Sequence, residues 1–170
     1  MPRRDDDEYV EFATAVQPQL RRTAYLMCGD WHRASDLAQE ALIKVYVAWP
    51  RLQRRDALHA YARKTLVSVA IDQGRKRSSK ELPTAEHPDR SVGDFTAELD
   101  DRNELMSALR QLPPRQRACV VLRYFEDLPV GAVAEALGCS EGNVKSQTSR
   151  ALDTLRRNLS TLELGEVGSW

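Results

Sequence analysis

The feature that most constrains this chain is the string PVGAVAEALGCSEGNVKSQTSRALDTLR at residues 129–156. It predicts two helices joined by a sharp turn. Ala134 is small enough for the two helices to cross closely, and Gly138 can adopt a positive φ without a Cβ clash. Ser140 can cap the following helix, because its hydroxyl oxygen can accept a hydrogen bond from the first backbone N–H groups of that helix. This combination is typical of a helix-turn-helix.

The second helix of this motif has two faces of different character. An apolar face predicts burial, and the opposite face displays Gly142, Asn143, Lys145, Ser146, Ser149 and Arg150. Asparagine and arginine side chains can read base edges, while lysine and serine can hold phosphates. The pattern therefore indicates binding of duplex DNA in the major groove. The alternative is an ordinary helical hairpin with a solvated face.

The rest of the chain also has helical spacing, and an all-α fold class is predicted. Helices are expected over 7–28, from about 35 to 49, over 57–75, through 105–112, from Pro114, over 130–137 and over 141–159. The predicted core residues are Phe12, Val16, Leu20, Ala24, Leu37, Ala41, Leu42, Val45, Tyr46, Trp49, Leu58, Tyr61, Ala62, Leu66, Val69, Ala70, Leu105, Leu109, Leu112, Val120, Val121, Tyr124, Phe125, Val144, Thr148, Ala151, Leu152 and Leu155.

Charge is distributed unevenly, although the formal net charge of the chain is zero. Residues 54–80 hold eight lysines and arginines against two aspartates, and residues 81–104 hold eight acids against two arginines. The stretch after residue 77 has almost no large apolar side chains and is too long for an ordinary loop within one domain. We predict two small helical domains, 7–77 and 101–160, joined by a flexible acidic linker over 78–100.

Several functional classes are disfavoured by the sequence. No segment approaches the roughly 18 apolar residues that a membrane span needs. The start MPRRDDDEYV turns acidic where a secretory signal needs an apolar core, so a cytoplasmic location is expected. The three separated cysteines fit small core thiols better than a disulfide or zinc site. We find no catalytic constellation, metal site, cofactor motif or small-molecule substrate site, and predict a protein that is not an enzyme.

The basic segment allows two interpretations. Lys64, Arg75, Lys76 and Arg77 could form a solvated helix end, because cations suit a helix C-terminus. Tyr61 and His59 lie among these cations, however, and aromatic rings with cations are typical of single-stranded DNA binding. Two DNA-binding modules on one chain would also gain affinity through effective concentration.

Three segments in order resemble the small two-domain RNA polymerase sigma factors of the extracytoplasmic-function (ECF) type. RTAYLMCGDWHRASDLAQEALIKVYVAWP resembles the first conserved domain, AYARKTLVSVAIDQGRKR resembles the helix that melts and reads the −10 element, and LRQLPPRQRACVVLRYFEDLPVGAVAEALGCSEGNVKSQTSRAL resembles the −35-binding domain. The resemblance covers nearly all of residues 9–159.

This resemblance implies partners and site residues. The partners would be core RNA polymerase, through the largest-subunit clamp and the flap, promoter DNA, and an anti-sigma factor. Polymerase contacts map onto Asp36, Gln39 and Glu40. The −10 contacts map onto Arg54, Arg55, Tyr61, Arg63, Lys64, Ser68, Arg75, Lys76 and Arg77. The −35 contacts map onto Ser140, Gly142, Asn143, Lys145, Ser146, Gln147, Ser149 and Arg150. The acidic linker would thread the basic channels of the polymerase.

The main rival is a self-contained repressor or response-type regulator that binds DNA as a dimer without polymerase. It leaves the basic N-terminal face unexplained, and no segment resembles a sensor or dimerisation domain. A nucleic-acid enzyme that uses the basic segment is a weaker rival, because no cluster of metal-binding carboxylates accompanies it.

Overall fold

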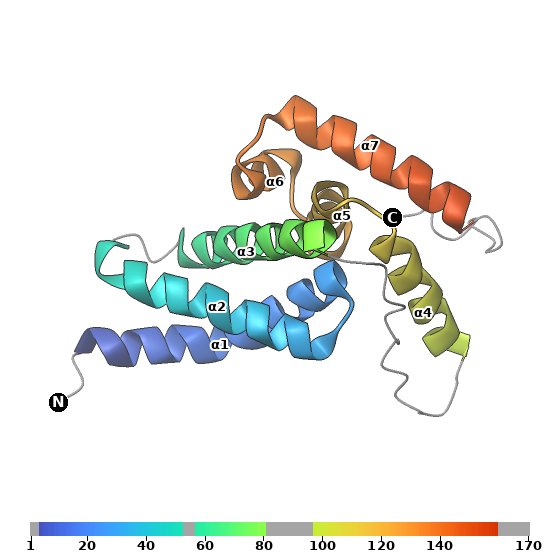
Figure 1. Cartoon of the computed structure of the whole chain (residues 1–170). Coiled ribbons are helices and arrows are strands. Elements are labelled where there is room, and N and C mark those ends of the chain that lie inside the picture. The colour runs from blue at the N-terminus through green and yellow to red at the C-terminus, as the bar shows by residue number, and fades with distance from the viewer. Residues whose placement is uncertain (1–3, 53–56, 81–96, 160–170) are drawn as a thin grey trace.

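The computed structural model describes residues 4–52, 57–80 and 97–159, and every regular element in those ranges is helical, as predicted. The elements are α1 (Arg4–Cys28), α2 (Trp31–Ala48), η1 (Trp49–Arg51), α3 (Leu58–Lys80), α4 (Ala97–Arg110), α5 (Pro114–Val120), η3 (Val121–Phe125), α6 (Val130–Leu137) and α7 (Glu141–Asn158). Helix α3 lies in the middle of the molecule, with α1 and α2 on one side and α5, α6 and α7 on the other (Figure 1).

Helices α1, α2 and α3 pack around the first apolar core. Its buried residues include Leu37, Val45 and Leu66, which were predicted from helical spacing. Tyr46 was also predicted to be buried, and this was wrong, because the side chain is 48% exposed. The Tyr46 ring packs edge-on against Tyr9, and its hydroxyl donates to Asp6 Oδ1 at 3.2 Å. Tyr46 therefore bridges α2 to α1 from the solvent side.

Helices α4 to α7 form the second half of the molecule. Pro114 occupies the first turn of α5. Backbone N–H groups in a first turn have no partner within the helix, so the N–H that proline lacks costs no hydrogen bond. The next turn, η3, is a π-helix in which the Glu126 N–H donates to the Val121 oxygen, five residues back, at 3.0 Å. This wider turn changes the direction of the side chains that follow. Phe125, predicted to be buried, is 40% exposed, and the Glu126 side chain reaches α1 instead.

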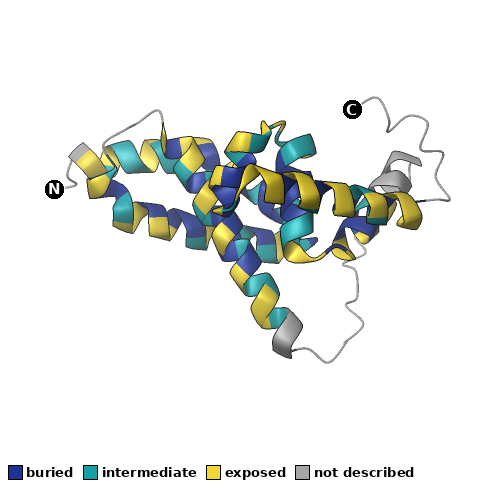
Figure 2. Ribbon diagram, turned by 90° about the horizontal axis from the view of Figure 1, so that it is seen from above, coloured by how far each residue is buried: buried dark blue, intermediate teal, exposed yellow. Residues whose placement is uncertain are grey.

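The two halves lie directly against each other. Apolar residues of α3 are packed into the core of the second half, and buried residues continue between the helices of both halves (Figure 2). The helices also extend into both ends of the predicted linker, because 78–80 belong to α3 and 97–100 to α4. The central part of that predicted linker, 81–96, lies outside the described residues.

Candidate DNA and polymerase interfaces

The turn between α6 and α7 has the geometry that the sequence predicted. Gly138 lies in the left-handed region with φ 64° and ψ 39°. Its N–H and that of Cys139 donate back to Glu135 and Ala134 oxygens, which ends α6 in a Schellman motif. Ser140 then caps α7, because its Oγ accepts from the Asn143 N–H at 3.1 Å. The motif is thus a helix-turn-helix in which the C-terminal end of α6 and the N-terminal end of α7 are both capped by hydrogen bonds.

Helix α7 presents one face to the core and one to solvent. Val144, Thr148, Ala151 and Leu155 are buried, and the Thr148 hydroxyl donates to the Val144 oxygen at 2.7 Å, so burial leaves it hydrogen-bonded. The predicted −35 residues share the other side of the helix or its cap. Exposed members are Ser140, Gly142, Asn143, Lys145, Ser146, Ser149 and Arg150, and Gln147 is partly buried. The outward side of α7 is largely exposed when the molecule is seen from above (Figure 2).

The predicted −10 residues of α3 fall on two sides of that helix. At about 100° per residue, Lys64, Ser68 and Arg75 form one stripe, and all three are exposed. Tyr61 borders this stripe and packs partly against the first core. Arg63 and Arg77 point to a different side of the helix, and Lys76 to a third direction. Arg54 and Arg55 lie outside the described residues.

The predicted polymerase contacts form one stripe on α2. Asp36 and Gln39 are exposed, and Glu40 is partly buried. The Glu40 Oε2 accepts from the Gln73 Nε2 of α3 at 2.6 Å. This bond fixes the Glu40 carboxylate against α3, so the fully accessible members of the stripe are Asp36 and Gln39.

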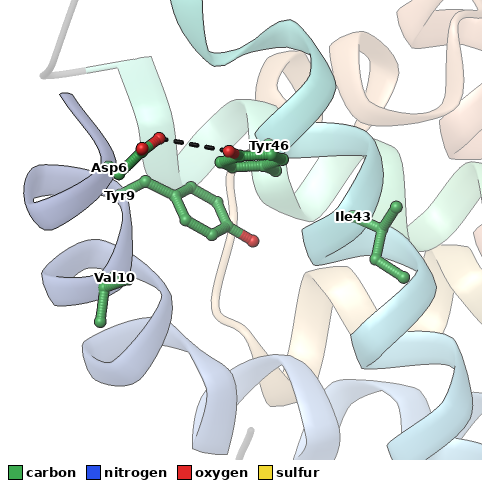
Figure 3. Close-up of a pocket in the computed structure, with 5 residues that line it drawn as sticks. All are labelled: Asp6, Tyr9, Val10, Ile43 and Tyr46. Atoms are coloured by element: carbon green, nitrogen blue, oxygen red, sulfur yellow. Dashed lines mark hydrogen bonds between the residues drawn. The ribbon is translucent and has the colours of Figure 1, made fainter. Parts of the chain in front are cut away.

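Sequence reasoning missed an apolar extension of the α2 stripe. Ile43 and Val47 are 63% and 64% exposed, and helical spacing places them in line with Asp36 and Glu40. On the adjoining side, a shallow hollow between α1 and α2 is lined by Asp6, Tyr9, Val10, Ile43 and Tyr46 (Figure 3). The sequence did contain a signal for this surface. Ile43 and Val47 are large apolar residues that fall outside the helical spacing of the buried residues of α2.

Two of the cysteines have thiols whose pKa is raised by burial. Burial raises the pKa of the Cys119 thiol to about 11, and burial also raises the pKa of Cys28. Both thiols are therefore protonated at neutral pH, as expected of structural cysteines. Within the described ranges, no three histidine, cysteine, aspartate or glutamate residues are grouped to hold a metal ion. In those same ranges, no helix is both long and apolar enough to cross a membrane.

Comparison with known families matches both halves of the chain separately. Residues 12–80 match the profile described as Sigma-70 region 2, and residues 102–155 match Sigma-70, region 4. The first range contains α2 and α3 with the candidate polymerase and −10 residues, and the second contains the helix-turn-helix.

Curated relatives are similar over most of the chain. The RNA polymerase sigma-E factor of Streptomyces avermitilis is 38% identical over 157 residues, which is 92% of this chain and 88% of the relative. The ECF RNA polymerase sigma factor SigM of Mycobacterium tuberculosis is 32% identical over 86% of this chain and 74% of the relative. Among solved structures, the sigma factor RpoE of Bartonella quintana, crystallised with the anti-sigma factor NepR, has the same fold. Its TM-score is 0.69 at 24% identity, with 92% of this chain and 99% of that chain covered.

Proposed function

The chain belongs to the ECF sigma factors of bacterial RNA polymerase, and from this premise we propose that it directs core polymerase to promoters by recognising −35 and −10 elements and opening the DNA. Members of this family bind core RNA polymerase and promoter DNA, and act in transcription initiation. The observation that carries the finer proposal is the exposed face of α7, which gathers the predicted −35 residues.

The α7 face supports reading of duplex DNA. Asn143 and Arg150 carry side chains that can bond to base edges, and Lys145 and Ser146 can hold the backbone. The first turn of any α-helix has backbone N–H groups without partners inside the helix, so the N-terminus of α7 favours a phosphate. In this proposal the Ser140 hydroxyl contributes by capping α7, since it already accepts from the Asn143 N–H.

The exposed stripe of α3 supports the −10 role. Lys64 and Arg75 can neutralise phosphates, and Tyr61, which is partly buried, lies one turn before Lys64 on the same helix. Unstacking a base costs a few kcal/mol, so cations and an aromatic ring near the exposed base offset part of that free energy. Arg63, Lys76 and Arg77 lie on other sides of α3 and would contact DNA only if the strand passes around the helix.

The α2 stripe supports the polymerase role. Its polar half, Asp36 and Gln39, can hydrogen-bond basic side chains of a partner. Its apolar half, Ile43 and Val47, offers a surface for apolar side chains of the same partner. An interface that joins an apolar centre to a polar rim is the usual design of specific protein contacts. We therefore include Ile43 and Val47 in the proposed clamp-binding surface.

Further elements of the proposal follow from the relatives. The RpoE protein of Bartonella quintana was crystallised with an anti-sigma factor, and we propose a partner of that class here. Action on the polymerase also implies a cytoplasmic location and no catalytic site of the chain's own. The two-domain division at 7–77 and 101–160, with the linker between, remains part of the proposal.

The decisive experiment mixes the purified chain with core polymerase on a library of randomised promoters. We expect initiation at a defined −35/−10 pair only when both proteins are present. Asp36→Ala and Ile43→Ala should each weaken core binding, whereas Glu135→Ala, an exposed acid on α6, should not. Tight binding of the isolated chain to a palindrome, without any effect on core polymerase, would indicate the dimeric repressor instead.

A further inference from the structure

An aromatic stack stands at the corner where α1 ends and α2 begins. Trp31, the first residue of α2, is 43% exposed, and its indole stacks on the Tyr25 ring of α1. The two ring centroids are 4.0 Å apart, and the ring planes differ by 4°. The Arg21 guanidinium lies 4.8 Å from the centroid of the same indole, and its Nε donates to Ser35 Oγ at 2.8 Å. Trp31, Tyr25 and Arg21 thus form an aromatic corner in which an exposed indole is held in a fixed orientation.

The aromatic corner also carries positive charge. Arg110 Nη2 and Arg117 Nε donate to backbone oxygens at the end of α1, at 2.6 and 2.7 Å. Burial lowers the pKa of the Arg117 guanidinium to about 10, and repulsion from Arg110 and Arg33 acts in the same direction. Arg33 makes no hydrogen bond or ion pair with any described residue, and the Asp30 carboxylate caps α2 through the His32 N–H. The Arg33 guanidinium is therefore available to a carboxylate from another part of the chain.

The 160–170 segment, which lies outside the described residues, has a composition that complements this corner. It reads STLELGEVGSW. Its large apolar and charged residues are Leu162, Glu163, Leu164, Glu166, Val167 and Trp170. Apolar side chains are stabilised when they cover an exposed aromatic ring, and a carboxylate is stabilised by a hydrogen bond from a guanidinium. The segment therefore offers both kinds of group that the aromatic corner can bind.

The 160–170 segment also begins close to the aromatic corner. Leu159 is buried in an apolar cluster with Met106 and Leu109 of α4, and Tyr25 packs partly against the same cluster. Helix α4 packs against both α1 and α7 (Figure 1). With about 10 Å between packed axes, α1 and α7 are separated by up to about 20 Å. An extended 160–170 segment spans about 36 Å at about 3.3 Å per residue, so it can reach Trp31.

The hollow between α1 and α2 fits the 160–170 segment less well. Asp6 lines that hollow, and Asp5 and Asp7 lie in the same first turn of α1. The two glutamates of the segment would meet like charges there. The hollow is also remote, because Tyr9 lies about 24 Å before Tyr25 along α1 at about 1.5 Å per residue. Charge and distance both favour the aromatic corner.

We propose that the 160–170 segment folds back onto the aromatic corner of its own chain, with apolar side chains over Trp31 and a carboxylate facing Arg33. A tethered segment acts at an effective concentration of about 1 mM, so a dissociation constant of about 1 mM leaves the corner covered about half of the time. The docked segment shields the indole from water and from other proteins. This contact requires neither polymerase nor DNA, so it is independent of the proposed function.

Fluorine NMR of the full chain labelled with 5-fluorotryptophan tests the docking. The chain has three tryptophans, Trp31, Trp49 and Trp170, and single substitutions to phenylalanine assign their signals. A soluble gadolinium chelate relaxes each fluorine according to its exposure. The segment variant Leu162→Ser/Leu164→Ser/Val167→Ser/Trp170→Ser should raise the relaxation of Trp31 at least twofold. Trp49, which is 9% exposed in the first core, is the internal control and should not change.

The charge contact is tested with the same measurement. Glu163→Gln/Glu166→Gln and Arg33→Gln should each raise the relaxation of Trp31 by about 1.5-fold, because each removes one side of the proposed ion pair. Arg51→Gln is the matched control, because Arg51 is exposed at the opposite end of α2, and it should leave Trp31 unchanged.

Three outcomes would overturn the proposal. The first is equal relaxation of Trp31 in the parent and in the segment variant. The second is a parent signal that changes on dilution, which would place the segment of a second copy on the corner. The third is a shift of Trp31 by a single-stranded oligonucleotide that is equal in the parent and in the segment variant, which would assign the corner to nucleic acid. Initiation with core polymerase, measured separately, reports on the proposed function alone.

Discussion

The two helices that carry the candidate DNA contacts, α3 and α7, differ in how many of their sides are buried. Helix α7 buries one face through Val144 and Ala151 and leaves the opposite face to solvent. Helix α3 buries Leu66 against α1 and α2, and buries Ile71 against α5 and α6. Its candidate DNA surface, the exposed stripe of Lys64, Ser68 and Arg75, is confined to a narrow strip between two packed sides.

This difference shows when helical spacing in a sequence can indicate which face of a helix is available to bind a partner. A helix packed on one side displays a clear apolar stripe, and the remaining residues are available for function. A helix packed on two sides has apolar residues around most of its circumference, so spacing alone does not tell which side meets a partner. Variants on the two packed sides of α3, and on the polar face of α7, test this comparison.

The largest effect is expected for Leu66→Ala, on the side of α3 that faces α1 and α2. The side chain is fully buried, and removing it leaves a cavity in the first core. We expect a loss of about 2–5 kcal/mol in the free energy of unfolding, measured by urea denaturation. Ser68→Ala is the control, because Ser68 is exposed and lies two residues after Leu66 on α3. This substitution should change the free energy of unfolding by less than about 0.5 kcal/mol.

Ile71→Ala tests the other packed side of α3. In the closed molecule Ile71 is 8% exposed, and its truncation should cost about 2 kcal/mol in the same urea experiment. An effect below about 0.5 kcal/mol would mean that α3 is packed on one side only in solution, as α7 is. Helices α3 and α7 would then not differ in the number of sides that they bury.

Arg150→Ala tests the open face of α7. A good bidentate contact to a base is worth about 1–3 kcal/mol, so −35-dependent initiation should fall about tenfold or more. Core binding, followed by co-elution with polymerase, should stay unchanged. Arg156→Ala is the matched control, because it is an exposed arginine nearer the C-terminal end of α7, beyond the predicted −35 residues. A loss of core binding in Arg150→Ala would show that this face contacts protein and not DNA.

Ser140→Ala should have the smallest effect. It removes the oxygen that accepts from the Asn143 N–H at 3.1 Å and should lower the free energy of unfolding by about 1 kcal/mol. Ser146→Ala, which is exposed within α7, should leave stability nearly unchanged. Equal stability of the two variants would mean that the cap contributes nothing measurable.

Two predictions from the sequence were wrong for reasons that lie in tertiary structure. Tyr46 fits the helical spacing of the buried residues of α2 closely enough to be predicted in the core. Its ring instead packs against Tyr9, and its hydroxyl donates to Asp6, on the solvent side of α2. Phe125 follows the apolar run of α5, but the π-helical turn changes its direction. Neither a partner on another helix nor a widened turn can be read from residue spacing alone.

The sequence by itself determined the all-helical class, most of the core of both halves, and the geometry of the α6–α7 turn. Each depends on local causes: helical period, the positive φ that Gly138 adopts, and the hydroxyl that Ser140 supplies. Only the tertiary structure decided that the halves close on each other through Ile71, Arg117 and Glu126. Those contacts join residues up to 107 positions apart, and no local pattern encodes which distant helix end an arginine or a carboxylate will meet.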